Sequence, residues 1–277
     1  MSSLTYKDLV FFINNYSKSD FINLCDYDFI DPVFWTILKC KKIINSDLKI
    51  DINSNSDANE YIKYILGKSY SQTTVPIRTV ETRAEVDKFS NELITVLNKD
   101  FENYDSEDVD FFKYILSELL NNAVDHGESF AVVSAQKFPK LNEFEISVVD
   151  AGLGFYQTIK RAYEDVNDDV EAIKEALKKG VTGAKTYLYA GSTRNVGRGL
   201  YVISQMVKDS EGELLILSGK GFYDFKSNSS LILEKSWNGS IVCVRLNLDK
   251  FKKNVMDFGK NDYMAKVLSE NDEEEIF

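Results

Sequence analysis

The sequence has little histidine, cysteine or proline, and each shortage limits what the chain can be. Among 277 residues there is one histidine, His126. The cysteines are Cys25, Cys40 and Cys243; their number is odd, their spacing is wide and no CxxC occurs, so neither a disulfide framework nor a zinc site is indicated. Three prolines are too few to mark a proline-rich linker between domains.

Long apolar runs and an excess of positive charge are also absent. No apolar run approaches the 18 residues typical of a membrane-spanning helix, and the first residues, MSSLTYKDLVFF, lack the regions of a signal peptide. The formal net charge of −11 gives no general attraction for nucleic acid or an anionic membrane surface, although it leaves room for a small basic phosphate pocket. We therefore expect a soluble cytoplasmic protein that binds neither nucleic acid nor membranes.

The composition is that of a globular protein. Hydrophobic residues make up 44% and charged residues 28%, and the length admits one large domain or two smaller ones. The first part of the chain predicts a helix over 6–18, a strand or loop over 21–30, a helix over 32–44 opened by Pro32 with Asp31 as N-cap, a strand over 48–52 and a helix over 57–70. Turn residues in 71–80 mark the boundary between a small α/β domain (1–75) and a larger domain (76–250).

The larger domain begins with helices and continues with consecutive strands. The patterns predict helices at about 82–99 and 108–126, strands at about 129–138 and 143–150, a polar, helical insertion over 156–196, a helix at about 198–208, and strands near 213–225, 229–237 and 239–248. This order favours an α+β fold, a two-layer sandwich of a mixed, mostly antiparallel sheet with helices on one face. Residues 251–277 are predicted to be an acidic C-terminal tail.

One helix carries a row of polar residues beside its apolar face. Glu118, Asn122 and His126 are four residues apart, so they lie along one stripe of the helix over 108–126. A carboxylate, an amide and an imidazole in a row suit a binding or catalytic site, but a solvated helix face would show the same pattern.

Three glycine-containing stretches follow. Asp150-Ala-Gly152-Leu-Gly154 comes at the end of an alternating strand, where a carboxylate can accept a hydrogen bond from an exocyclic amine and glycines let the backbone approach a flat ligand; a tight turn is the simpler interpretation. Gly197-Arg-Gly199 opens a helix, whose free N–H groups favour phosphate. A Gly-Ser pair, ending at Ser240, precedes the last strand.

Taken in order, ExxxNxxxH, DxGxG, GxGL and Gly-Ser before a final strand resemble the nucleotide-site motifs of the GHKL ATPases, the histidine-kinase-like or Bergerat-fold superfamily. Its members include type II topoisomerases, heat-shock chaperones, sensor histidine kinases, mismatch-repair proteins and anti-sigma-factor serine kinases. The resemblance covers about residues 80–250, and SELLNNAVDHGE is most similar to the anti-sigma-factor kinases. It implies the Bergerat fold, with ATP and Mg²⁺ as cofactors.

The resemblance also implies a role for each matched residue around the base and the metal. Asn122 would hold Mg²⁺ through its amide oxygen, since this hard cation takes oxygen ligands. Glu118 would be the general base that takes a proton from water or a substrate hydroxyl. Asp150 would accept the adenine amino group, and Gly152 and Gly154 would line the base.

Other matched residues would contact the phosphates or close the site. The segment Gly197, Arg198, Gly199 and Leu200 would meet the phosphates, and residues 156–196 would form a mobile lid. Ser240 stands where the family often has threonine and would hold a water between Asp150 and adenine. Lys185, Arg194 and Arg198 are candidates for phosphate contacts, although solvated surface charges are the simpler interpretation.

Two functions follow from the resemblance. The only histidine, His126, lies inside the nucleotide motif, where it is either packed at the end of the helix or takes part directly in the chemistry. No separate histidine is left to accept a phosphoryl group, so self-phosphorylation on a dedicated histidine is excluded. The chain is expected to be an ATP-dependent regulator with slow ATPase or serine/threonine kinase activity on a protein partner, or a non-catalytic module whose interactions respond to ATP. Residues 25–52 faintly resemble the strand–helix–strand core of STAS-like domains, a partner type of anti-sigma kinases; an unrelated α/β cap is the alternative. The sequence is also compatible with a homodimer.

Overall fold

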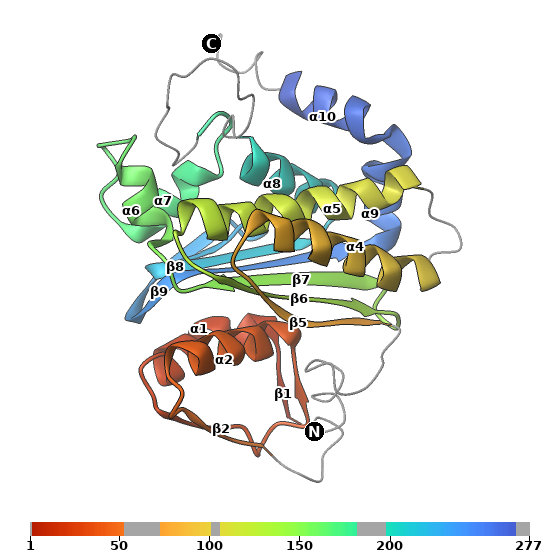
Figure 1. Cartoon of the computed structure of the whole chain (residues 1–277). Coiled ribbons are helices and arrows are strands. Elements are labelled where there is room, and N and C mark those ends of the chain that lie inside the picture. Colours follow the sequence, from red (N-terminus) through yellow and green to blue (C-terminus); the bar gives the residue numbers. More distant parts are fainter. Residues whose placement is uncertain (1, 53–72, 101–105, 182–197, 270–277) are drawn as a thin grey trace.

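The computed structural model describes residues 2–52, 73–100, 106–181 and 198–269 and has an α+β fold built on one five-stranded sheet (Figure 1). The strand order is β5-β6-β7-β9-β8, and each neighbouring pair is antiparallel. The strands are β5 (Thr74–Val80), β6 (Ala131–Phe138), β7 (Glu143–Asp150), β8 (Glu213–Asp224) and β9 (Ser229–Asn247). In the part of the chain so described, no helix is long and apolar enough to cross a membrane.

Helices cover one face of the sheet and its β8 edge. They are α4 (Arg83–Asp100), α5 (Ser106–Asn121), α6 (Gly154–Lys160), α7 (Asp169–Ala176), α8 (Gly199–Asp209), α9 (Leu248–Asn254), the 3₁₀ turn η3 (Met256–Phe258) and α10 (Lys260–Ser269). α5 buries an apolar stripe against this face, where the rings of Phe112 and Phe144 lie 5.2 Å apart. The long helix predicted from periodicity is confirmed.

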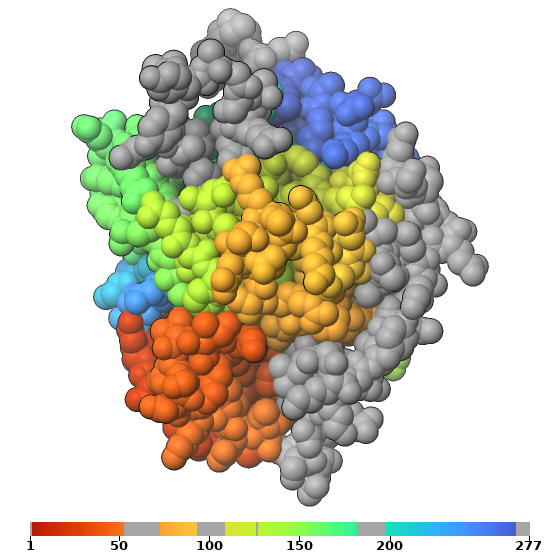
Figure 2. Space-filling model, in the orientation of Figure 1, coloured from red at the N-terminus to blue at the C-terminus, as the bar shows by residue number. Residues whose placement is uncertain are grey.

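The opposite face of the sheet is covered by the N-terminal residues, a packing that the sequence did not predict (Figure 1). The N-terminal elements are β1 (Ser3–Leu4), the 3₁₀ turn η1 (Tyr6–Asp8), α1 (Leu9–Tyr16), β2 (Phe21–Asn23), β3 (Phe29–Ile30), α2 (Pro32–Ile44) and β4 (Lys49–Asp51). Figure 1 shows α1 and α2 directly beneath the sheet, and in Figure 2 residues 2–52 form a lobe that contacts the rest of the molecule. Apolar residues from both parts form one core.

The N-terminal residues contain the expected strand–helix–strand order. β2 and β4 pair in parallel, with α2 between them in the sequence, but each strand has only three residues. The helices pack on the large sheet and share its core instead of covering a sheet of their own. This geometry is that of a cap on the larger sheet, and the STAS-like resemblance stays a prediction. The helix predicted over 57–70 lies outside the described residues.

A buried ionic network joins the cap to the sheet. Arg245 on β9 donates to Glu145 on β7 through Nε (2.9 Å) and to Asp31 through Nη2 (2.9 Å). Its guanidinium also stacks on the rings of Tyr6 (4.2 Å) and Phe138 (4.5 Å). Asp31 stands at the predicted N-cap of α2, but its carboxylate accepts from the Tyr6 N–H and from Arg245 instead of capping the helix. Because Arg245 pairs with Glu145 and Asp31, these carboxylates can be buried between the cap and the sheet.

Replacing Arg245 with lysine tests how much this network contributes. Lysine keeps the charge, but it cannot donate in a fork to several carboxylates or stack in the same way. We expect the free energy of unfolding in urea to fall by about 2 kcal/mol, the scale of lost hydrogen bonds to charged groups. The control is Arg78→Lys, because Arg78 forms an exposed pair with Glu92. Equal effects of the two changes would contradict a stabilising buried network.

Two further segments differ from the predictions. Residues 251–269, expected as part of an acidic tail, are helical and packed: Phe251 and Tyr263 are both fully buried, and the Tyr263 hydroxyl donates to Asp209 (3.0 Å). The first part of the predicted lid is also packed, since α7 contributes buried Ala172 and Ile173 to the main core. The lid over 156–196 stays a prediction, and residues 182–197 lie outside the described residues.

Candidate functional site

The polar row of α5 lies where the helix changes geometry. Glu118 and Asn122 are half-buried, while the apolar stripe of the same helix is buried in the core. The α-helix ends at Asn121 and continues as a π-helical turn, η2 (Asn122–His126). Such turns are rare in proteins and occur often at functional sites. Periodicity predicted an ordinary helix here, because a one-turn widening leaves the sequence pattern almost unchanged.

Gly127 connects the end of this helix to the DxGxG loop. Its N–H donates to the Asn122 carbonyl (3.0 Å), and its carbonyl accepts from the Leu153 N–H (3.0 Å). A Cβ at Gly127 would lie 2.3 Å from the Ala123 carbonyl oxygen and 3.3 Å from the Asp150 carboxylate, and a Cβ at Gly152 would lie 2.0 Å from the Gly127 carbonyl oxygen. Both positions therefore require glycine. The polar row and the DxGxG loop, predicted separately, come together in the fold.

Asp150 is almost completely buried at the end of β7, with 2% of its surface exposed. One carboxylate oxygen accepts from the Gly152 N–H (2.9 Å), and the other accepts from the Ser240 hydroxyl. Burial raises the pKa of Asp150 to about 6, against the opposite effect of these hydrogen bonds. The Trp237 indole N–H donates to the Asp150 carbonyl (2.8 Å) and fixes the backbone at the same residue.

The Gly-Ser pair lies within a strand and not at a hairpin turn. β9 runs without interruption from Ser229 to Asn247, whereas two strands were predicted. Gly239 has a φ of +99°, and a Cβ there would lie 2.6 Å from the Asp150 carboxylate. The register of the β8–β9 pair shifts next to this point, so the strand bulges instead of turning. This bulge aims Ser240 at Asp150.

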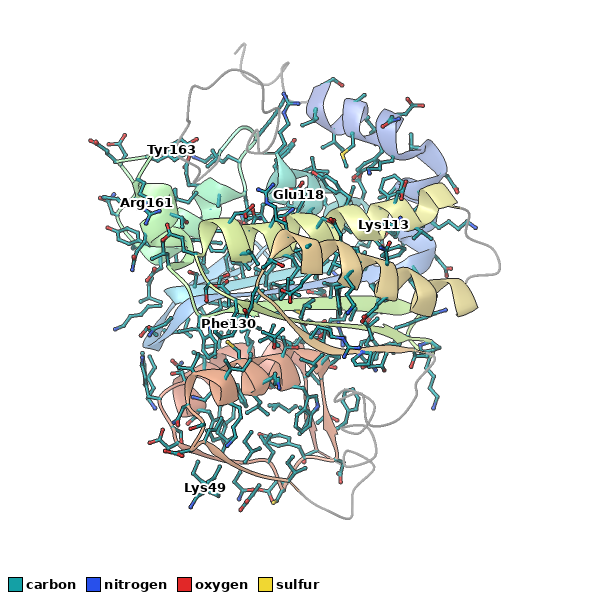
Figure 3. The ribbon with its side chains drawn as sticks, viewed as in Figure 1. Lys49, Lys113, Glu118, Phe130, Arg161 and Tyr163 are labelled. Atoms are coloured by element: carbon teal, nitrogen blue, oxygen red, sulfur yellow. The ribbon has the colours of Figure 1, made fainter. Side chains whose placement is uncertain are left out.

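The third glycine motif contacts the polar row of α5. A Cβ at Gly199, the first residue of α8, would lie 2.0 Å from the Glu118 carboxylate oxygen Oε2. Figure 3 shows Glu118 on α5 beside α8. Burial raises the pKa of Glu118. The pKa of Tyr114 is also raised, mainly by burial and then by the negative charge of Glu118, while Arg198 has the opposite effect. Tyr114, Glu118 and Arg198 are therefore close enough to interact electrostatically.

Not every predicted residue has a described position near the site. Arg198 is exposed, and Leu200 is buried in the main core, so Leu200 contributes packing more than a ligand contact. Gly197 and the phosphate candidates Lys185 and Arg194 lie outside the described residues, as does the side chain of His126.

A cavity of about 380 Å³ opens beside the DxGxG loop. Gly152, Leu153 and Gly239 line it, and Glu118 and Asn122 do not. Its other lining residues are Ala151, Tyr156, Gln157, Asp169, Gly219, Ser236, Trp237 and Asn238. Sequence reasoning missed Trp237 and Gly127, although each is adjacent to a recognised motif. In the described ranges no group of three or more His, Cys, Asp or Glu residues is placed to hold a metal ion.

A comparison of the sequence with models of protein families gives no match, and a comparison with curated proteins gives none either. Inference of a function therefore depends on the motif order and on the geometry of these residues.

Proposed function

We propose that the protein binds Mg-ATP at the junction of α5, the DxGxG loop, α8 and β9, and that it uses ATP in slow hydrolysis or in phosphoryl transfer to a hydroxyl of a protein partner. The proposed domain is a Bergerat-type ATPase domain of the GHKL kind. The observation that carries the proposal is the convergence of four motifs. Gly127 joins Asn122 to the DxGxG loop, Ser240 donates to Asp150, and Glu118 contacts Gly199.

The base end of the site fits an adenine. Asp150 accepts hydrogen bonds from the Gly152 N–H, the Ser240 hydroxyl and the Ser240 N–H, whereas an ionised carboxylate has about four acceptor positions. The remaining capacity suits an exocyclic amine, and a buried acceptor makes that hydrogen bond selective, since an unpaired partner in such a place is costly. Gly152 and Gly239 keep side chains away from the carboxylate.

The phosphate end fits less completely among the described residues. Gly199 opens α8, a helix of 11 residues whose first N–H groups favour an anion, and Arg198 precedes it. Asn122 is half-buried at the start of the π turn and would supply one oxygen to Mg²⁺, which usually keeps several waters besides phosphate oxygens. When bound, the cation would neutralise phosphate charge.

Glu118 is the group with the chemistry of a general base. Its carboxylate is half-buried and its pKa is raised by burial, which makes it a better proton acceptor than an ordinary surface glutamate. It lies at the start of α8, where the transferred phosphoryl group is expected. From this position it would take the proton from an attacking water or hydroxyl.

A second candidate is an ATP-responsive binding module without turnover. The favouring observation is Trp237, which holds the Asp150 carbonyl and also lines the space next to the N-terminal cap. Nucleotide binding at Asp150 would therefore affect, through Trp237, the surface that the cap shares with β9. The partner would be a protein, with a second copy of the chain as one option.

Calorimetry of the pure protein with ATP and Mg²⁺, followed by incubation with radiolabelled ATP, tests the proposal. Saturable binding with slow phosphate release or protein labelling is the expected result. Binding without release or labelling, with candidate partners present, would favour the second candidate. Absence of any nucleotide binding would overturn both.

The pH dependence of nucleotide binding should reflect Asp150. Its folded pKa of about 6 is raised by burial, so the carboxylate that accepts the amine is present above this pH and is lost as the pH falls through it. We expect ATP affinity to fall below pH 6, measured by calorimetry from pH 5 to 8. Because ATP itself titrates in this range, the informative comparison is Ser240→Ala, which removes a hydrogen bond that lowers this pKa. Its midpoint should move to higher pH; an unchanged midpoint would contradict the assignment.

A further inference from the structure

A second cavity lies between the N-terminal cap and β9. Its volume is about 220 Å³. It is lined by the C-terminal ends of α1 and α2 and by one stretch of β9, namely Ser17, Lys18, Ser19, Asp20, Lys41, Ile44, Asn45, Ser236, Trp237 and Asn238. The last three of these also line the cavity beside the DxGxG loop, so the two cavities share one stretch of β9.

Lys41 is a nearly buried cation at this cavity, with 9% of its surface exposed. Its ammonium donates to the Ser17 carbonyl (2.7 Å), and it makes no ion pair within the described part of the chain. An ammonium has three N–H donors, so one carbonyl leaves it only partly satisfied. Burial lowers its pKa. Asp20 in the same lining attracts the ammonium without forming an ion pair with it, so the cost of burying this cation is only partly offset, and a bound anion would offset the rest.

Ser17 provides an independent sign of an incomplete site. Its hydroxyl oxygen is buried and has no hydrogen-bond partner among the described residues. Such groups are rare in native structures, because buried polar atoms are normally paired. Lys41 and Ser17 line the same cavity, and each has donor capacity that the described residues leave unused.

We infer that this cavity binds a small organic carboxylate, with its anionic group at Lys41 and Ser17 and its apolar part against Ile44 and Trp237. The ionic residues of the lining are Lys18, Lys41 and Asp20, which sum to a single positive charge. That balance suits one carboxylate better than a doubly charged phosphate.

Trp237 connects this site to the proposed nucleotide site. The residue is 4% exposed, and its indole N–H holds the Asp150 carbonyl. A ligand against the indole would bias the position of β9 at Asp150, and the two sites would then affect each other reciprocally. This coupling rests on the proposed function, whereas binding of the carboxylate does not.

The test uses NMR of the full-length protein with its tryptophan indole N–H groups labelled. The chain has two tryptophans, so Trp35→Phe assigns the Trp237 signal. The probes are benzoate, acetate and inorganic phosphate. We expect a saturable shift of the Trp237 signal with benzoate in the millimolar range, and a weaker response to phosphate. Lys41→Met should abolish the shift, while Lys39→Met, an exposed position on the same helix, should leave it unchanged.

Clear outcomes overturn the inference. No saturable shift with any of the three probes, or a shift that persists in Lys41→Met, would do so. If Lys41→Met fails to fold by circular dichroism, Asn45→Asp replaces it, because a second carboxylate in the lining should repel the probe. A separate calorimetric titration of ATP with and without benzoate measures the coupling, for which we expect about a fivefold change in affinity. Failure of ATP to bind at all would leave the NMR result intact.

Discussion

Asp150→Asn is expected to weaken ATP binding by about 10- to 100-fold. The amide that replaces one carboxylate oxygen is a donor, so it would face the donor amine of adenine instead of accepting from it. A lost hydrogen bond to a charged group costs about 1.5–3 kcal/mol, and each 1.4 kcal/mol is about tenfold in affinity. Calorimetry with Mg-ATP at pH 7.5, above the Asp150 pKa of about 6, measures the change on the ionised wild type.

The fold should survive this substitution. The remaining oxygen of the asparagine can still accept from the Gly152 N–H or the Ser240 hydroxyl. Thermal melting and circular dichroism check this point. Asp87→Asn, on the exposed face of α4, is the matched control with the same change of charge. An ATP affinity within threefold of wild type in a folded Asp150→Asn would remove Asp150 from the site.

The sequence alone predicted several element boundaries and brought separate motifs close together, but it did not predict the layer on the second face of the sheet. The boundaries of α2 (Pro32–Ile44) and β7 (Glu143–Asp150) match the predictions, because both segments have strong periodicity and clear flanking residues. The motifs also predicted that Ser240 lies near Asp150, and the two side chains are hydrogen-bonded. The Ser240 hydroxyl donates directly to Asp150, and the water expected between Asp150 and adenine stays a prediction.

The second helical layer could not be predicted from periodicity. The alternation of Phe144, Glu145, Ile146 and Ser147 is typical of a strand with one solvated face, yet all four are buried. The polar side is tolerated because Glu145 pairs with Arg245, 100 residues away in the sequence. A periodic pattern shows which side chains are polar, and it does not show which distant partner covers them.

Tertiary contacts likewise decided the shape of β9 and the position of Glu118. A Gly-Ser pair is typical of a turn, but Gly239 takes its positive φ within a bulge because the strand continues to pair with β8. The contact of Glu118 with Gly199 joins α5 to α8, and no local pattern records how two helices approach. The glycine requirement at 199 becomes evident only when the neighbouring carboxylate is in place.

Glu118→Gln is expected to lower the rate of ATP hydrolysis or phosphoryl transfer by about 10²–10⁴-fold, the usual contribution of a general base. Glutamine keeps the shape of the side chain at the start of α8 but cannot take a proton. ATP affinity should stay the same or increase, because a negative charge next to the expected phosphates is removed. Single-turnover measurements with radiolabelled ATP separate the rate from the affinity.

Two comparisons separate a base from a structural residue. Glu164→Gln, at an exposed position, carries the same change of charge and should leave the rate unchanged. Gly199→Ala keeps Glu118 but puts a methyl group 2.0 Å from its Oε2, so the carboxylate must move and the rate should fall by about tenfold or more. A wild-type rate in Glu118→Gln would remove the base from the mechanism. If Gly199→Ala alone lost activity, α8 and not the carboxylate would be the group that the chemistry requires.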